Sequence, residues 1–210
     1  MLTHVVCVFG DSIVLGTGDE SGCGWTGRVA RRALAAQCSL AMYNLGVGSH
    51  TVDDISGRWR AECEVRMPDS LRGAVIFSFG LNDATHERGQ PRVSLRRCLA
   101  TARDIMCEAR ERWEVMWIGP IPIDERSQPR RVSSGEVRHK TNAEIGRYDA
   151  EFRCLAGEIE VPYLSLFAIL SADTHWPALL TDGVHPSARG YSRLASLIGA
   201  WTAWRQFVGS

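Results

Sequence analysis

The chain has 210 residues, 45% hydrophobic and 23% charged, which is enough for one domain with a sizeable core but not for two ordinary ones. Its 24 Lys and Arg residues, of which Lys140 is the only lysine, balance 24 Asp and Glu residues. No net charge would therefore hold the chain on DNA, RNA or an anionic membrane. We predict one domain over residues 1–210 that does not act on nucleic acid.

Cysteine usage and the N-terminal sequence bear on the compartment. The seven cysteines are an odd number without a C-x-x-C motif, which is typical of free thiols in a reducing compartment. The first residues lack the basic stretch and cleavage site of a secretory signal, and no apolar run reaches the roughly 18 residues of a membrane span. The expectation is a cytoplasmic protein without a membrane span.

Short apolar runs alternate with longer helix-like segments, which is the pattern of an α/β domain with a mainly parallel sheet. The predicted strands are 5–9, 41–45, 74–79, 115–118 and 162–164. The predicted helices are 26–38, 52–67, 93–112, 136–157 and 187–207. The strands are continuously apolar, which indicates a sheet covered on both faces. The sequence therefore predicts a three-layer α/β/α sandwich with a flavodoxin-like sheet of about five strands.

The stretch 124–135 has little apolar periodicity and contains Arg126, Arg130 and Arg131 together with serines and a proline. This composition predicts a loop or lid rather than a linker between domains. The three arginines are interpreted as a solvated face, and attraction of anionic substrates is the alternative.

The residues directly after the predicted strands are the candidates for catalysis and binding, because ligands of an open parallel sheet bind beyond the carboxyl ends of its strands. Three segments of small or polar residues follow the first three strands: Gly10-Asp11-Ser12, Gly46-Val47-Gly48-Ser49 and Gly80-Leu81-Asn82-Asp83. All three are expected to face one crevice.

Near the C-terminus, Asp182 stands three residues before His185 on a turn that precedes the last predicted helix. A serine hydroxyl is too weakly acidic to attack unaided, so it needs a histidine as base and a carboxylate that orients the histidine. Ser12, His185 and Asp182 can fill these roles. The Asn82 amide and the N–H groups of the 46–49 turn can stabilise the oxyanion of a tetrahedral intermediate.

In this order, the four segments resemble the SGNH hydrolase, or GDSL-like lipase and acylhydrolase, superfamily over nearly the whole chain. The resemblance implies Ser12 as nucleophile, His185 as base and Asp182 as orienting acid. It also implies an oxyanion hole of Asn82 with backbone N–H groups of Ser12 and of the second segment. Ser49 stands where the family usually has a glycine, with Gly48 one residue earlier, so either of the two is a candidate donor. Asp11 and Asp83 are assigned to hydrogen bonds of their loops.

The expected activity is therefore that of a serine esterase or acylhydrolase that cleaves a small-molecule carboxylic ester through an acyl-enzyme, without a cofactor. The resemblance covers lipids, short-chain esters, acetylated sugars and thioesters, and the short chain favours small or water-soluble esters. A carbohydrate acetylesterase and a thioesterase remain open, as does a non-catalytic module that binds a small ligand in the same crevice.

Other residues and motifs carry weaker hypotheses. Trp176, His50 and His86 are candidate substrate contacts because they lie beside the predicted catalytic segments. The glycines of 22–27 match G-x-G-x-x-G, but they stand well beyond the first strand, so we interpret them as structural. No metal site is expected, because no paired histidine motif is present and a metal would compete with the triad for His185.

Overall fold

Five parallel strands form the middle layer of the computed structural model, which describes residues 2–132 and 135–209. The strands are β1 (His4–Gly10), β2 (Leu40–Gly46), β3 (Arg72–Ser78), β6 (Glu114–Ile118) and β9 (Tyr163–Leu164). Their spatial order is β2-β1-β3-β6-β9, the doubly wound order of flavodoxin-like sheets. The predicted sheet is confirmed. The chain adds β2 on one side of β1, and β3, β6 and β9 on the other side. Such folds bind their ligands at the carboxyl ends of the strands where this order changes direction, here between β1 and β3.

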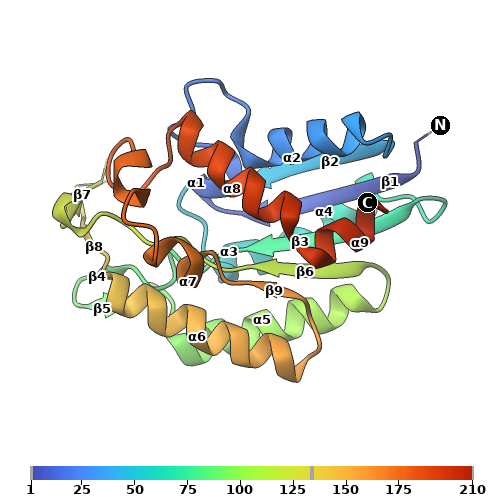
Figure 1. The fold of residues 1–210 in the computed structure, drawn as a ribbon. Coiled ribbons are helices and arrows are strands. Elements are labelled where there is room, and N and C mark those ends of the chain that lie inside the picture. Colours follow the sequence, from blue (N-terminus) through green and yellow to red (C-terminus); the bar gives the residue numbers. More distant parts are fainter. Residues whose placement is uncertain (1, 133–134, 210) are drawn as a thin grey trace.

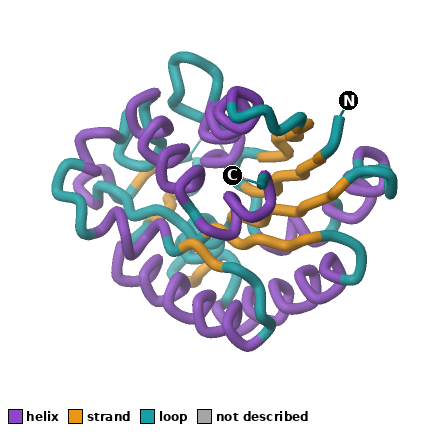
Figure 2. The backbone as a smooth tube through the Cα atoms, turned by 45° about the vertical axis from the view of Figure 1, so that its right-hand side comes forward, coloured by secondary structure: helices purple, strands orange, loops and turns teal. Residues whose placement is uncertain are grey.

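Helices cover both faces of this sheet (Figures 1 and 2). One face carries α2 (Gly24–Ala35), α8 (Ala188–Ala200) and α9 (Thr202–Val208). The other carries α3 (Val52–Ser56), α4 (Trp59–Arg66), α5 (Leu95–Arg110) and α6 (Asn142–Glu158). The short helices are α1 (Ser12–Leu15), α7 (Leu166–Ser171), η1 (Glu125–Ser127) and η2 (Trp176–Leu179). The three-layer prediction is thus confirmed.

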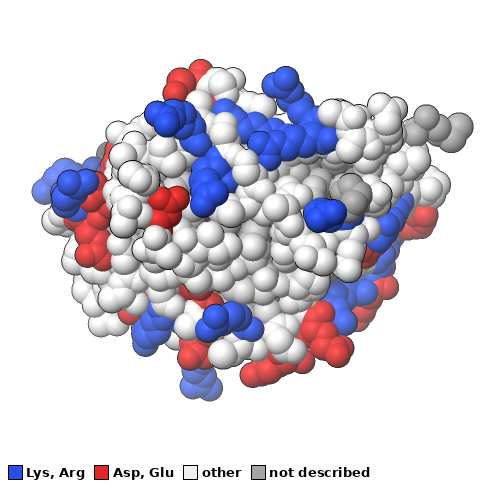
Figure 3. All heavy atoms as spheres, viewed as in Figure 1, with Lys and Arg blue, Asp and Glu red and all other residues white. Residues whose placement is uncertain are grey.

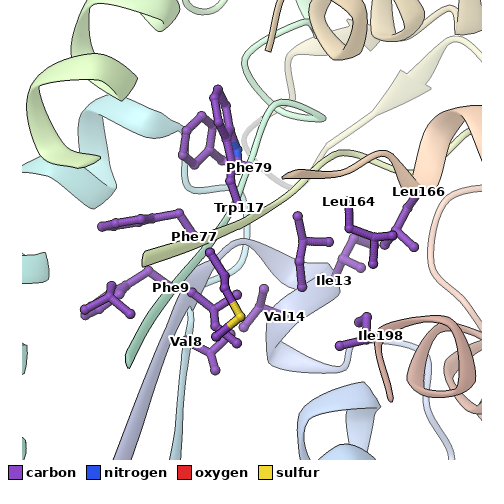
Figure 4. Close-up of a cluster of buried hydrophobic side chains, with 14 of the residues drawn as sticks. Val8, Phe9, Ile13, Val14, Phe77, Phe79, Trp117, Leu164, Leu166 and Ile198 are labelled. Carbon is purple, nitrogen blue, oxygen red and sulfur yellow. The ribbon is translucent and has the colours of Figure 1, made fainter. Parts of the chain in front are cut away.

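The core lies on both sides of β1 and β3, whose apolar residues are almost completely buried. Phe9 stacks on Phe77 with ring centroids 5.8 Å apart, and Figure 4 shows Ile13 and Val14 of α1 reaching the same core. A Cβ at Gly10 would lie 2.3 Å from the Val14 side chain. Glycine there lets the chain turn sharply from β1 into α1, and this turn places residue 12 at the sheet edge.

Three predicted helices differ from the observed ones at their ends or centres. The segment 52–67 divides into α3 and α4 at Gly57, which ends α3. The last helix divides at Trp201, whose backbone is extended. The helix predicted from residue 136 begins only at Asn142, because the Thr141 side chain accepts the N–H of Glu144 and caps it.

A second, small sheet lies beyond the carboxyl ends of the main strands (Figure 1). It contains β4 (His86–Glu87), β5 (Gln90–Pro91), β7 (Arg130–Arg131) and β8 (Val137–His139) in the order β5-β4-β8-β7, all antiparallel. The stretch 124–135 was predicted as a loop or lid, and it supplies η1 and β7. Residues 133 and 134 lie outside the described residues. Sequence analysis missed this sheet, since strands of two or three residues leave no periodic pattern.

The surface is mixed in charge. On the face drawn in Figure 3, basic and acidic side chains are interspersed along the lower edge, whereas basic side chains gather over α2 and α8 at the top. That basic area includes Arg28, Arg31 and Arg32 of α2. Within residues 2–132 and 135–209, every helix is too short or too polar to cross a membrane.

Candidate active site

The turn after β1 and the turn before α8 bring Ser12 and His185 together. Ser12 is the first residue of α1, and the side chain of Asp11 caps this helix by accepting the N–H of Ile13 at 2.8 Å. His185 follows a turn in which Gly183 has a φ of +81°, a left-handed conformation that suits glycine. His185 Nε2 lies 3.0 Å from Ser12 Oγ. The two residues are 173 positions apart in the sequence, so the fold alone creates this contact.

Asp182 completes a continuous chain of hydrogen bonds. Its Oδ2 lies 2.8 Å from His185 Nδ1, and its Oδ1 accepts the backbone N–H groups of Val184 and His185 at 3.0 and 2.8 Å. The Arg130 guanidinium donates to the same Oδ2 at 2.9 Å. Burial opposes ionisation of Asp182, but these hydrogen bonds outweigh it and hold the pKa of the carboxyl well below its usual range. Asp182 is therefore an anion at neutral pH and holds the imidazole in one orientation.

Asn82, the side chain predicted to bind the oxyanion, lies beside Ser12 in the turn that follows β3. Its Nδ2 donates to the carbonyl of His50 at 3.1 Å and lies 3.3 Å from Asp11 Oδ2. The side chain is buried, and it still lines the cavity that contains Ser12. These contacts fix the orientation of the amide before any substrate arrives.

The second segment contains a strained residue. Ser49 has a φ of +68°, in the left-handed region that costs a non-glycine residue about 1 kcal/mol, whereas Gly48 is not in this region. Ser49 lines the cavity with Ser12 and Asn82, and Gly48 does not. Arg92 donates to the Ser49 carbonyl at 2.9 Å and holds the turn in place. This geometry favours Ser49 over Gly48 as the residue at the site.

Asp83 ties the third segment to the second. Its carboxylate is fully buried and accepts the backbone N–H groups of Val52 at 2.9 Å and Gly80 at 3.0 Å. The loop hydrogen bonds assigned to Asp11 and Asp83 are thus confirmed. Burial raises the pKa of each carboxyl to about 6, even though backbone N–H groups oppose the shift.

This raised pKa has a measurable effect on stability. Between the usual Asp value of 3.8 and about 6, the folded protein binds the Asp83 proton more tightly than the unfolded chain does. The contribution of Asp83 to stability is therefore present at low pH and is lost as the pH rises through 6. We expect the unfolding free energy of the wild type, relative to Asp83→Asn, to fall by about 1 kcal/mol between pH 5 and pH 7. Urea unfolding of both proteins at each pH measures this difference, and a constant difference would refute it.

A cavity of about 340 Å³ opens at these residues. Its walls contain the following side chains: Ser12, Ser49, Leu81, Asn82, Gln128, Arg130, Arg131, Val132, Arg138, Lys140, Val184 and His185. The wall is mainly polar. The sequence does not predict that Gln128, Arg138 and Lys140 line this cavity, because 136–157 resembles one continuous helix and Gln128 lies in a stretch without periodicity.

The three weaker substrate-contact candidates do not line this cavity. Trp176 is buried, and its indole N–H donates to the carbonyl of Pro122 at 2.8 Å, so it packs beside a different cavity. His50 contributes its carbonyl to Asn82, while its ring faces the Arg58 guanidinium. His86 pairs with His139 in the small sheet. The structure thus brings together Ser12, Asp182, His185, Asn82 and Ser49, and it leaves these three outside.

The structure also shows where the glycine motif lies and whether a metal site is present. The glycines of 22–27 lie at the start of α2, after α1 and not directly after a strand, as the structural interpretation expects. In the described part of the chain, no three His, Cys, Asp or Glu side chains converge as metal ligands would.

Comparisons with known proteins agree with this fold. Solved structures similar to the chain include the acetylxylan esterase Axe2 from Geobacillus stearothermophilus, with 21% identity, a TM-score of 0.72 and coverage of 98% of this chain and 94% of that one. The lipase/acylhydrolase from Enterococcus faecalis has 23% identity and a TM-score of 0.75, over 99% and 96% of the two chains. A G-D-S-L family lipolytic protein from Veillonella parvula has 17% identity and a TM-score of 0.70, over 93% and 96%.

Sequence comparison gives a complementary result. No curated protein matches the chain. The model of the GDSL-like Lipase/Acylhydrolase family, by contrast, matches residues 8–193, which include the end of β1 and all four predicted catalytic segments. The chain therefore belongs to the GDSL-like lipase/acylhydrolase family and is a carboxylic ester hydrolase.

Proposed function

We propose that the chain cleaves a small carboxylic ester through a covalent acyl-enzyme on Ser12. The observation that carries this proposal is the hydrogen-bonded chain from Asp182 through His185 to Ser12 Oγ, with contacts of 2.8 and 3.0 Å, at the wall of an open cavity. A nucleophile, a base and an orienting carboxylate in this geometry are what acyl transfer to a serine requires.

In the first half-reaction, Ser12 Oγ attacks the ester carbonyl carbon while its proton passes to His185 Nε2. The tetrahedral intermediate then expels the alcohol oxygen, which takes the proton from His185, and the acyl group stays on Ser12. In the second half-reaction, water attacks the acyl carbon and gives a proton to His185 Nε2. The bond between the acyl carbon and Ser12 Oγ then breaks, Ser12 takes this proton from His185, and the carboxylic acid leaves. Asp182, which is ionised at neutral pH, stabilises the imidazolium that forms in each half.

The negative charge on the carbonyl oxygen is stabilised by the Asn82 amide and by the backbone N–H groups of Ser12 and Ser49. The support for Ser49 over Gly48 is its place in the cavity wall and its left-handed backbone. The Asn82 amide has two N–H groups, which point to the His50 carbonyl at 3.1 Å and to Asp11 Oδ2 at 3.3 Å. The N–H on the longer contact turns to the oxyanion, while the contact with His50 keeps the amide in place.

The mainly polar cavity wall favours esters with short acyl groups. Its apolar side chains are Leu81, Val132 and Val184, whereas its other lining residues are polar or charged. An acyl pocket for long chains would gain about 0.8 kcal/mol for each buried methylene, and this wall offers little apolar surface for that gain. A carbohydrate acetyl ester fits the same polar wall and is the second candidate substrate.

Hydrolysis of p-nitrophenyl acetate, butyrate and octanoate tests this function. We expect turnover of the acetate and the butyrate, and a kcat/KM for octanoate no higher than that for butyrate. A steady rise of kcat/KM up to octanoate would contradict the short-acyl assignment. Folded protein that hydrolyses none of the three would instead favour a non-catalytic module that binds a ligand in this cavity.

A further inference from the structure

The charge of the catalytic cavity differs from the charge of the chain as a whole. Four of its twelve lining residues are basic, namely Arg130, Arg131, Arg138 and Lys140, and none is acidic. The complete chain has 24 basic and 24 acidic residues. The equal numbers of basic and acidic residues in the chain do not by themselves explain why the cavity wall contains basic residues and no acidic ones. Three of the four basic residues come from β7 and β8 of the small sheet, and Lys140 directly follows β8.

Two of these four cations have carboxylate partners inside the protein. Arg130 donates to Asp182 at 2.9 Å. Arg138 donates to Glu87 at 2.7 Å, and its guanidinium also lies 3.3 Å from Ser49 Oγ. These arginines hold the small sheet against the catalytic loops, and their charges are largely balanced.

In the part of the chain that the structure describes, the other two cations have no carboxylate within ion-pair distance. Arg131 donates to the carbonyl of Gly135, and within residues 2–132 and 135–209 it forms no ion pair. In the same described part of the chain, the Lys140 ammonium forms neither an ion pair nor a hydrogen bond, although it lines the cavity. Burial, followed by repulsion from Arg138, lowers the pKa of Lys140 to about 8. Lys140 therefore stays mostly cationic at neutral pH.

The Asp11 carboxylate attracts the Lys140 ammonium without forming an ion pair with it, and this attraction does not outweigh burial and repulsion from Arg138. An ammonium that is largely removed from water in this way is unfavourable, and a bound anion would relieve the penalty. Carboxylates and phosphates suit the site best, because a guanidinium can bind two of their oxygens at once and an ammonium binds them as a point charge. Both unpaired cations share one cavity with Ser12 and His185, so an anion there belongs to the molecule that is cleaved.

We propose that the substrate is a small ester that carries a carboxylate or phosphate group, and that Arg131 and Lys140 bind this group while Ser12 attacks the ester carbonyl. The proposal rests on the proposed function and names its substrate class. The basic side chains lie around the cavity on both the Asp182 side and the Ser49 side, so the anion belongs to either the acyl half or the alcohol half.

Two matched pairs of esters test the two halves. For the acyl half, mono-4-nitrophenyl glutarate is compared with 4-nitrophenyl pentanoate. For the alcohol half, 4-acetoxybenzoate is compared with 4-acetoxybenzamide. A charge-assisted hydrogen bond contributes enough for an about 10- to 100-fold higher kcat/KM with the anionic ester. We expect this preference in at least one pair, and we expect it to weaken as salt is added.

The variant Arg131→Gln/Lys140→Gln gives the decisive comparison. Its ratio of anionic to neutral kcat/KM is expected to fall close to one, because both unpaired cations are removed. Arg31→Gln, which removes an exposed arginine of α2 next to a different cavity, is the control and should keep the wild-type ratio. Both esters are measured on the same protein sample, so the ratio is independent of how much of a variant is folded.

Three outcomes would overturn the proposal. In the first, wild-type protein cleaves the neutral esters in a Ser12-dependent reaction without any preference for the anionic partner, and the proposed function still stands. In the second, the preference exists but is unchanged in Arg131→Gln/Lys140→Gln, which would assign it to other residues. In the third, folded wild-type protein cleaves none of the four esters, and the proposed function fails as well.

Discussion

Ser12→Ala is expected to lower kcat for p-nitrophenyl acetate by about 10⁴- to 10⁶-fold, with a loss of the same order for His185→Ala. The first change removes the atom that would become acylated, and the second removes the base 3.0 Å from it. The two losses should not add, because each disables the same proton transfer. Steady-state kinetics of the single and double variants measure both the size of the losses and their non-additivity.

We expect Ser12→Ala to fold like the wild type. The Ser12 hydroxyl contacts the His185 ring, and alanine is a good helix former at the start of α1. Ser196→Ala, at an exposed serine of α8, is the matched control and should keep wild-type turnover. Near-wild-type kcat in purified Ser12→Ala would show that the reaction does not use this serine.

Asn82→Ala is expected to lower kcat by about 10²- to 10³-fold with little change in KM, because an oxyanion donor acts mainly in the transition state. Asn82→Asp keeps the size of the side chain but replaces the amide donor with a carboxylate, so it should be at least as impaired. Kinetics on p-nitrophenyl acetate separate the effect on kcat from the effect on KM.

A purely structural role for Asn82 would give a different result. The His50 carbonyl loses its amide donor in Asn82→Ala, so some stability is lost as well. If turnover fell only in proportion to the folded fraction seen by thermal unfolding, Asn82 would hold the loop and not the oxyanion. A loss in kcat of fully folded variant protein supports the oxyanion role.

Much of the site could be predicted from the sequence because parallel strands deliver their carboxyl ends to one edge. Gly10-Asp11-Ser12 and Gly80-Leu81-Asn82 follow β1 and β3, which are neighbours in the sheet. The Asp182–His185 spacing likewise encodes a local turn, whose hydrogen bonds the structure shows. Apolar runs and their alternation with helical segments predict the strands, and the residues directly after each strand can then be read from the sequence.

The cationic wall could not be predicted in the same way. β7 and β8 have two and three residues. They pair with each other, and β8 also pairs with β4, about 50 positions earlier in the chain. Such pairings depend on tertiary contacts and not on a local pattern. Only the fold shows that Arg138 and Lys140 lie with Ser12.

Trp176 is a residue that the sequence placed near the substrate and that the structure places elsewhere. Its position just before the Asp182 loop suggested a wall of the substrate pocket. In the fold, the side chain is buried and its N–H is satisfied by the Pro122 carbonyl, which is the usual environment of a core tryptophan. Proximity in sequence to a catalytic residue therefore does not establish which way a large aromatic side chain packs.

The most direct test of the account is to locate the covalent adduct of a fluorophosphonate probe by peptide mass spectrometry. The proposed mechanism requires a single adduct on the peptide containing Ser12, formed much more slowly in His185→Ala because the base that activates the serine is missing. Labelling of another serine, or an absence of labelling in folded protein that hydrolyses the p-nitrophenyl esters, would contradict Ser12 as the nucleophile.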